Sequence, residues 1–239
     1  MLPPQQPPTP DSPELSPLAI GEDLAPLPAY KAAGTTEIGF EGLLAAPPLR
    51  LREDLASGCG GQTWPAGMVL ARHMLRYHRD DVREARILEL GAGGGLVGLA
   101  VAKGCAVDKN PLYITDQVEM HSLMEHNIGL NGLEGRVKAA ILNWGEPLPQ
   151  DIAAFKPDVI LAADCVYFEP AFPLLLATLS DLLKLCPSAT VYFCFKKRRR
   201  ADMQFLKKAQ KMFKVSEVED EDRPTFSREG LFLYTFQAA

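Results

Sequence analysis

Hydrophobic residues in the chain follow two alternating patterns. Short, mostly apolar runs typical of buried strands are separated by stretches in which apolar residues recur at helical spacing. The runs that predict strands are Arg86–Leu90, Leu112–Thr115, Val137–Leu142, Val159–Ala163, Thr190–Phe195, Phe213–Val218 and Leu231–Phe236. The stretches that predict helices are Met68–Tyr77, Leu96–Lys103, Gln117–Leu130, Pro170–Leu185 and Ala201–Met212. This alternation predicts a mostly parallel, doubly wound α/β sheet with helices on both faces.

The N-terminal part of the chain has a different character. Residues 1–28 are rich in proline and polar side chains, which predicts a disordered leader, with a proline-motif ligand as the alternative. Alternating patterns over Thr36–Phe40 and Pro48–Arg52 predict a β-hairpin, and Ser57–Gly61 predicts a flexible loop. We therefore divide the chain into a leader at 1–28, a β extension with its loop at 29–66, and a main domain at 67–239.

Composition and charge exclude several classes of protein. The chain has 239 residues, 47% of them hydrophobic, which suits a globular fold, and its net charge of −5 argues against a binder driven by nucleic-acid phosphates. No signal peptide is visible, and the apolar run Leu174–Leu179 is far shorter than the ~20 residues that cross a bilayer. The five cysteines form no CxxC pair and the histidines have no metal-ligand spacing, so we expect reduced thiols, no metal site and a cytoplasmic protein.

The segment Glu89–Gly98 carries the most chemistry. It follows a predicted strand and opens a predicted helix, and Gly93, Gly95 and Gly98 satisfy the GxGxxG spacing. Glycines there let the backbone approach a ligand closely. A tight turn without a ligand is one interpretation, and a dinucleotide or S-adenosylmethionine site is another.

Two acidic residues bear on that choice. Asp116 ends the next predicted strand, where a carboxylate can accept hydrogen bonds from the ribose hydroxyls of either cofactor. Glu89 is expected at the mouth of the turn, where it would repel a pyrophosphate but suit an ammonium group and a sulfonium. The pair therefore favours S-adenosylmethionine.

Further candidates follow other predicted strands. Asp164 and Tyr167 come after Val159–Ala163, at the sheet edge where α/β proteins bind ligands, although a helix cap and a half-buried aromatic are the structural alternatives. Trp144 follows Val137–Leu142 and is expected beside the adenine site, although a lone tryptophan is more often part of a core.

Taken in order, these segments resemble the seven-β-strand protein-lysine methyltransferases of the methyltransferase-like 21 group, methyltransferase family 16. The segments that carry the resemblance are Gly58–Gly67, Glu89–Gly98, Ile114–Asp116, Asn143–Gly145 and Ala162–Tyr167. The resemblance implies a Rossmann-like, seven-stranded, mostly parallel sheet of the class I S-adenosylmethionine-dependent methyltransferases, preceded by a short β extension. It implies cofactor contacts from Trp64, Gly91, Ala92, Gly93, Asp116, Trp144 and Ala163, to which the charge argument adds Glu89.

On the lysine side, Asp164 and Tyr167 match the acid-x-x-aromatic motif of the family, which implies catalytic roles. The chain departs from the group at Asn143, where Asp is common, and in the apparent insertion at Asp108–Pro111. The fungal subgroup that methylates translation elongation factor 1-alpha is the most similar, so that protein is the expected substrate, acted on by a monomer with no direct nucleic-acid or membrane partner.

Other functions stay open at this point. They are methylation of another protein such as a chaperone, of a small molecule or of a nucleic acid, a binding module without activity, and a dinucleotide oxidoreductase. The basic run Lys196–Arg200 is interpreted as a solvated helix start, a patch for an acidic surface of the substrate, or an import or RNA-contact signal.

Overall fold

A seven-stranded sheet forms the centre of the protein. The computed structural model describes residues 33–55, 59–107 and 109–239, so the predicted leader, Ser57, Gly58 and Asp108 lie outside the described residues. The strand order is β5-β4-β3-β6-β7-β9-β8. The strands are β3 (Ile87–Leu90), β4 (Leu112–Asp116), β5 (Val137–Ile141), β6 (Val159–Ala163), β7 (Thr190–Lys196), β8 (Phe213–Glu217) and β9 (Leu231–Ala238). β3 to β7 are parallel and β9 runs antiparallel to β7 and β8, which confirms the predicted α/β class.

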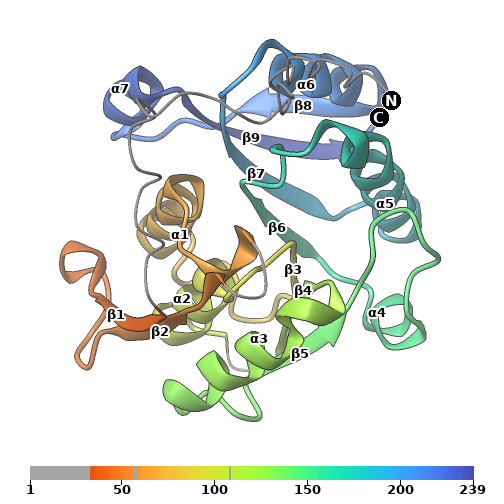
Figure 1. Cartoon of the computed structure of the whole chain (residues 1–239). Coiled ribbons are helices and arrows are strands. Elements are labelled where there is room, and N and C mark those ends of the chain that lie inside the picture. Colours follow the sequence, from red (N-terminus) through yellow and green to blue (C-terminus); the bar gives the residue numbers. More distant parts are fainter. Residues whose placement is uncertain (1–32, 56–58, 108) are drawn as a thin grey trace, which may run out of the picture. The chain divides into compact units, whose positions relative to one another are not determined.

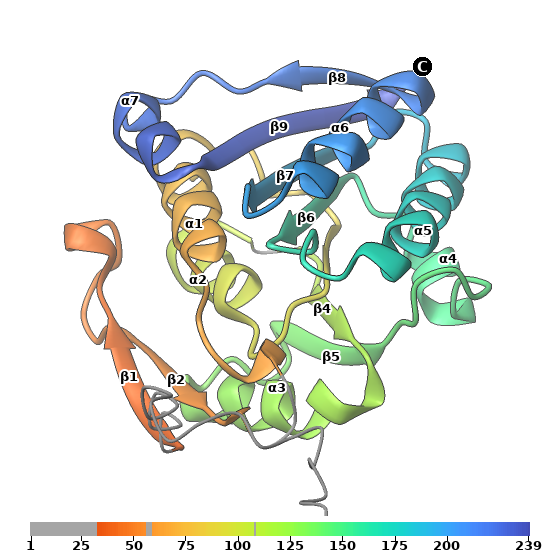
Figure 2. The ribbon, with the colours of Figure 1, turned by 45° about the horizontal axis from the view of Figure 1, so that its top comes forward.

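Helices cover both faces of this sheet (Figures 1 and 2). One face carries α1 (Pro65–Tyr77), α2 (Leu96–Gly104) and α3 (Val118–Leu130), and the other carries α4 (Gln150–Phe155), α5 (Phe172–Leu185) and α6 (Arg200–Met212). Shorter elements are α7 (Arg223–Phe226) and the 3-10 turns η1 (Phe40–Gly42), η3 (Cys59–Gly61), η4 (Glu169–Ala171) and η5 (Ser227–Glu229). Each face buries its own apolar cluster, because strands covered on both sides must be apolar on both sides.

Stacked aromatic rings fill the second of these clusters. The Phe193 ring lies 5.4 Å from that of Phe205 in α6 and 4.9 Å from that of Phe236 in β9, both nearly parallel to it. All three side chains are fully buried. Aromatic pairs at this separation add stability beyond the area they bury, so they hold α6 and β9 against β7.

The predicted hairpin forms a separate two-stranded sheet. β1 (Gly34–Ile38) pairs antiparallel with β2 (Leu49–Glu53). Asn127 in α3 and Asn131 directly after it bind the edge of β2: Asn131 exchanges hydrogen bonds with the backbone of Arg50, and Asn127 does so with Arg52. The Asn127 amide also donates to the Gly94 carbonyl at 2.8 Å, so one buried side chain ties the hairpin to the glycine turn.

The boundaries of the predicted elements agree with the structure to within three residues. Phe40, predicted in a strand, begins η1 with a positive φ of 48° and buries its ring. Pro170, predicted in the first turn of α5, lies in η4, and Pro173 occupies the helix start instead. The short helices α4 and α7 were not predicted, because each offers too few residues to show a helical period.

Among the described residues, no helix combines the length and apolar character needed to cross a membrane. Four cysteines, Cys105, Cys165, Cys186 and Cys194, are free thiols with buried side chains, in agreement with the prediction from their spacing.

Candidate active site

A cavity of about 1010 Å³ opens at the carboxyl ends of β3, β4 and β6. All ten residues predicted for the site line it: Trp64, Glu89, Gly91, Ala92, Gly93, Asp116, Trp144, Ala163, Asp164 and Tyr167. They come from segments far apart in the sequence, and parallel pairing of β3 with β4 and with β6 brings them to one sheet edge. The volume lies at the upper end of the usual range for small-molecule sites, so it has room for a cofactor and an acceptor side chain.

The glycine turn between β3 and α2 forms the floor of this cavity. Gly91, Gly93 and Gly95 all have a positive φ, a conformation that side chains rarely adopt. A Cβ at Gly93 would lie 2.4 Å from the Gly60 carbonyl oxygen, and one at Gly91 would lie 2.9 Å from the Trp144 ring. The turn is thus a cradle that only glycine can form, which fits the close approach of an adenosyl cofactor to the backbone.

Asp116 lies at the end of β4, beside that cradle. Its carboxylate accepts hydrogen bonds from the backbone N–H of Gly93 and of Gln117, each at 2.7 Å. Burial raises the pKa of this carboxyl, and the two N–H donors oppose the shift. Each oxygen keeps a lone pair, so Asp116 can hold the turn in shape and still accept from ribose hydroxyls.

Glu89 does not lie at the mouth of the turn, and that expectation is wrong. The side chain is 2% exposed and lies beneath the turn, where its Oε2 accepts from the backbone N–H of Gly98 at 2.7 Å. The free N–H groups at the start of α2 attract the carboxylate inward. Burial raises the pKa of Glu89 to about 8, so the group is largely protonated at neutral pH.

Two tryptophans bound the cavity. Trp64 precedes α1, and the loop that carries it is held by buried Glu53, whose Oε1 accepts from both the backbone N–H and the hydroxyl of Thr63. Trp144 lies against Gly91 in a loop fixed by the Gly145 N–H, which donates to the buried hydroxyl of Thr178. Neither ring is fully buried, so both have surface available for a ligand.

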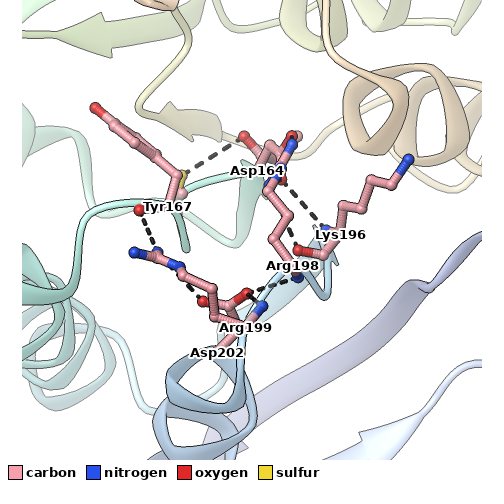
Figure 3. Close-up of polar contacts among 8 residues, drawn as sticks. Asp164, Tyr167, Lys196, Arg198, Arg199 and Asp202 are labelled. Atoms are coloured by element: carbon pink, nitrogen blue, oxygen red, sulfur yellow. Dashed lines mark hydrogen bonds and ion pairs between the residues drawn. The ribbon is translucent and has the colours of Figure 1, made fainter. Parts of the chain in front are cut away.

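Asp164 and Tyr167 line the same cavity and belong to the segment that follows β6 (Figure 3). Asp164 directly follows β6 with a left-handed φ of 57°, and its side chain is only 4% exposed. Its carboxylate is paired with the guanidinium of Arg198 through two hydrogen bonds, at 2.8 and 2.6 Å. Tyr167 is half-exposed at the rim.

The basic run is more than a solvated helix start. The side chain of Asp202 accepts from the backbone N–H groups of Arg198 and Arg199, each at 2.7 Å, and fixes the beginning of α6. The Arg199 guanidinium donates to the Tyr167 carbonyl. The segment after β7 is therefore tied to the segment after β6 at several points.

Three residues that shape the site were not predicted: Glu53, Asn127 and Arg198. Glu53 and Asn127 act through partners distant in sequence, which no local pattern reveals. Arg198 stood inside a visible basic run, but nothing distinguished it from its neighbours before its contact with Asp164 was known.

Comparison with known proteins shows which protein family this chain matches. A family model described as lysine methyltransferase matches residues 43–212. The protein-lysine N-methyltransferase EFM6 of Saccharomyces cerevisiae is 38% identical over 84% of this chain and 89% of its own length. The EEF1A lysine methyltransferase 3 of Mus musculus is 33% identical over 59% of this chain and 57% of its own.

Among solved structures, the mitomycin 7-O-methyltransferase MmcR matches with a TM-score of 0.52 at 12% identity, over 73% of this chain and 53% of that one. The chain therefore spans about half of that structure. At this identity the match concerns the fold alone, and it confirms the predicted class I methyltransferase architecture.

Proposed function

The chain belongs to the lysine methyltransferase family, as its motifs predicted, and on that premise we propose that it methylates a lysine of translation elongation factor 1-alpha. Lysine methylation with S-adenosylmethionine is the activity of the family; the acceptor protein and the roles of individual residues are our proposals. One observation carries them: the glycine cradle, the acid at the end of β4 and the acid-x-x-aromatic segment after β6 line a single cavity.

S-adenosylmethionine, when bound, supplies a methyl group on a sulfonium: the methyl–sulfur bond breaks as the lone pair of the lysine nitrogen forms the methyl–nitrogen bond. An ammonium with a pKa near ~10.4 has no lone pair, so the acceptor lysine must first lose a proton to water. The protein contributes chiefly by alignment and by a partly dehydrated site.

We assign the adenosyl side of the cavity to the glycine cradle with Gly91, Ala92 and Gly93, and to Asp116. Trp64, Trp144 and Ala163 would bound the cofactor, since all three line the same cavity. Glu89 would act from beneath the turn, where an approaching cation favours its ionised form against the burial that protonates it.

We assign the lysine side to Asp164 and Tyr167. Asp164 compensates the positive charge that accumulates on the nitrogen as the methyl is transferred, because its carboxylate belongs to the acid-x-x-aromatic segment after β6 and lines the cavity. Tyr167, half-exposed at the rim, forms part of the channel through which the lysine enters. Neither residue needs to be a strong base, since proton loss precedes transfer.

The choice of acceptor protein rests on two supports. The sequence resembles the fungal subgroup that methylates elongation factor 1-alpha, and a mouse relative is named as an EEF1A lysine methyltransferase. We further propose a cytoplasmic enzyme that acts as a monomer. The buried free thiols suit a reducing compartment, and every residue assigned here comes from one chain.

The test is methyl transfer with purified components. Elongation factor 1-alpha from cells lacking this enzyme is incubated with the protein and S-adenosylmethionine carrying a labelled methyl group, and tryptic peptides are read by mass spectrometry. We expect label on one lysine, and none when that lysine is replaced by arginine. Label only on a chaperone or a small molecule added in parallel would reject the proposed substrate, and no label on any acceptor would reject the activity.

A further inference from the structure

The guanidinium of Arg198 contacts the buried carboxylate of Asp164 (Figure 3) and an aromatic ring of the cavity wall. It donates two hydrogen bonds to Asp164, and its central carbon lies 5.3 Å from the centre of the Trp64 ring. Arg198 itself lines the cavity, with a side chain that is 30% exposed against 4% for Asp164. An acceptor lysine entering the cavity therefore meets the guanidinium before it meets the carboxylate.

Further hydrogen bonds fix both members of the Asp164–Arg198 ion pair. The Lys196 backbone N–H also donates to the Asp164 carboxylate, at 3.2 Å, and the Asp164 backbone N–H donates to the Cys194 carbonyl at 2.8 Å. The backbone of Arg198 is fixed by Asp202. A buried carboxylate stripped of its partner is strongly destabilised, so Arg198 cannot leave Asp164 unless another cation replaces it. A neutral amine, which is the form that attacks, is no such replacement.

The other ionisable residues that line the cavity are mostly acidic. They are Arg52, Glu53, Asp116, Glu119 and Glu146, together with Glu89, which is largely protonated at neutral pH. Arg52 lies 3.7 Å from Asp54 across an ion-pair contact. The charged groups that act on the Arg198 guanidinium are the carboxylates of Asp164 after β6 and Asp202 in α6, and the Lys196 contact is with a backbone carbonyl. Arg198 is therefore the fixed positive charge on the lysine side of the described cavity wall.

We propose that Arg198 is a positioning residue for methyl transfer: it holds the Asp164 carboxylate in place and presents a fixed positive charge that favours the neutral form of the acceptor lysine. This inference rests on the proposed function. A like charge nearby disfavours an ammonium, so the amine sheds its proton more readily. Asp164, kept within reach, balances the methylammonium once the methyl has been transferred.

The test compares Arg198→Gln, Arg198→Lys and Arg200→Gln with the wild type. Arg200 belongs to the same basic run and is exposed at the start of α6, so Arg200→Gln is a matched control for the loss of one charge. The readout is kcat for methyl transfer to purified elongation factor 1-alpha at saturating cofactor, from pH 6 to pH 10. Thermal unfolding and cofactor affinity are measured on the same preparations.

For Arg198→Gln we expect kcat at pH 7 to fall about tenfold or more, and the rising limb of its pH profile to move up by about one pH unit. Arg198→Lys keeps the charge but not the two-point contact, so its kcat falls while its profile stays in place. Arg200→Gln should match the wild type in both respects. Because Arg198→Lys leaves no unpaired buried charge, it remains informative if Arg198→Gln unfolds.

An unmoved profile in Arg198→Gln, or a moved one in Arg198→Lys, would overturn the inference. A lower KM for the protein with unchanged or higher kcat in Arg198→Gln would also overturn it, since Arg198 would then only be blocking the cation site of Asp164. These outcomes leave the proposed function standing. No transfer by the wild type would instead reject the proposed function, and the inference with it.

Discussion

Replacing Asp164 with asparagine separates charge from shape at the lysine side of the site. Asparagine tolerates the left-handed φ of 57° found at this position, whereas alanine would add backbone strain of about 1–2 kcal/mol. The substitution keeps the size of the side chain and one accepting oxygen, and it removes the negative charge. A positioned group of this kind is worth about 10²–10⁴-fold in rate, or about 3–5 kcal/mol of transition-state stabilisation.

The cost to folding should be smaller than the cost to catalysis. Removing one partner of a fully buried ion pair costs about 3–5 kcal/mol, but the Arg198 side chain is 30% exposed and can turn toward water. Cofactor affinity should change little, because among the described residues the hydrogen-bond partners of the Asp164 carboxylate are Arg198 and the Lys196 backbone, and not the glycine cradle or Asp116.

The assay pairs titration calorimetry with S-adenosylmethionine and methyl transfer to elongation factor 1-alpha, each on wild type and Asp164→Asn. We expect near-normal binding with turnover reduced by two to four orders of magnitude. Near-normal transfer would make Asp164 a structural residue that only anchors Arg198. An equal loss of binding and transfer would place the carboxylate in the cofactor site instead.

Four further predictions follow from the structure and the sequence. Gly93→Ala should abolish cofactor binding measured by calorimetry, since its Cβ would lie 2.4 Å from the Gly60 carbonyl oxygen. Gly132→Ala is the control, because Gly132 has a similar φ of 62° but open space around it, and it should only lower stability by about 1 kcal/mol. Equal effects of the two substitutions would refute the role of the glycine cradle in cofactor binding. Asp116→Ala should weaken cofactor binding by about 1.5–3 kcal/mol, and an unchanged Kd would show that Asp116 does not bind the ribose. Burial raises the pKa of Glu89 to about 8 from the 4.5 of the unfolded chain, so the wild type loses folding stability as the pH rises between those values. Glu89→Gln lacks this loss, so its free energy of unfolding in urea, relative to wild type, should rise from pH 5 to pH 8 by up to about 1.4 kcal/mol per pH unit. Parallel pH profiles of the two proteins would contradict the shift. Removing residues 1–28 should leave turnover unchanged, because a proline-rich segment contributes no core, and a large fall in activity would refute this.

The sheet could be predicted because its strands are buried on both faces. β6 is a continuous apolar run bounded by Asp158 and Asp164, and such a run leaves little freedom in where a strand ends. Phe40 could not be placed in the same way. Its alternating neighbours suit a strand, but burial of its ring in the core is decided by tertiary packing, which outweighs local pattern.

The site was predictable as far as it depends on the ends of strands. The glycine turn, Asp116 and Asp164 all reach one cavity because parallel strands share a carboxyl edge. The direction of a side chain within that edge was not predictable. The Glu89 side chain lies beneath the start of α2, where it accepts a hydrogen bond from Gly98, and Arg198 donates to Asp164, 34 residues away in the sequence. Both contacts form only because folding brings the partners together.

The most direct test of the account is transfer to the proteins of cells that lack this enzyme. Their lysate is incubated with the purified protein and S-adenosylmethionine carrying a deuterated methyl group, and every labelled residue is located by mass spectrometry. We predict deuterated methyl on a lysine side chain of elongation factor 1-alpha, present with wild type and strongly reduced with Asp164→Asn. Label confined to nucleic acid, to small molecules or to residues other than lysine would contradict the account.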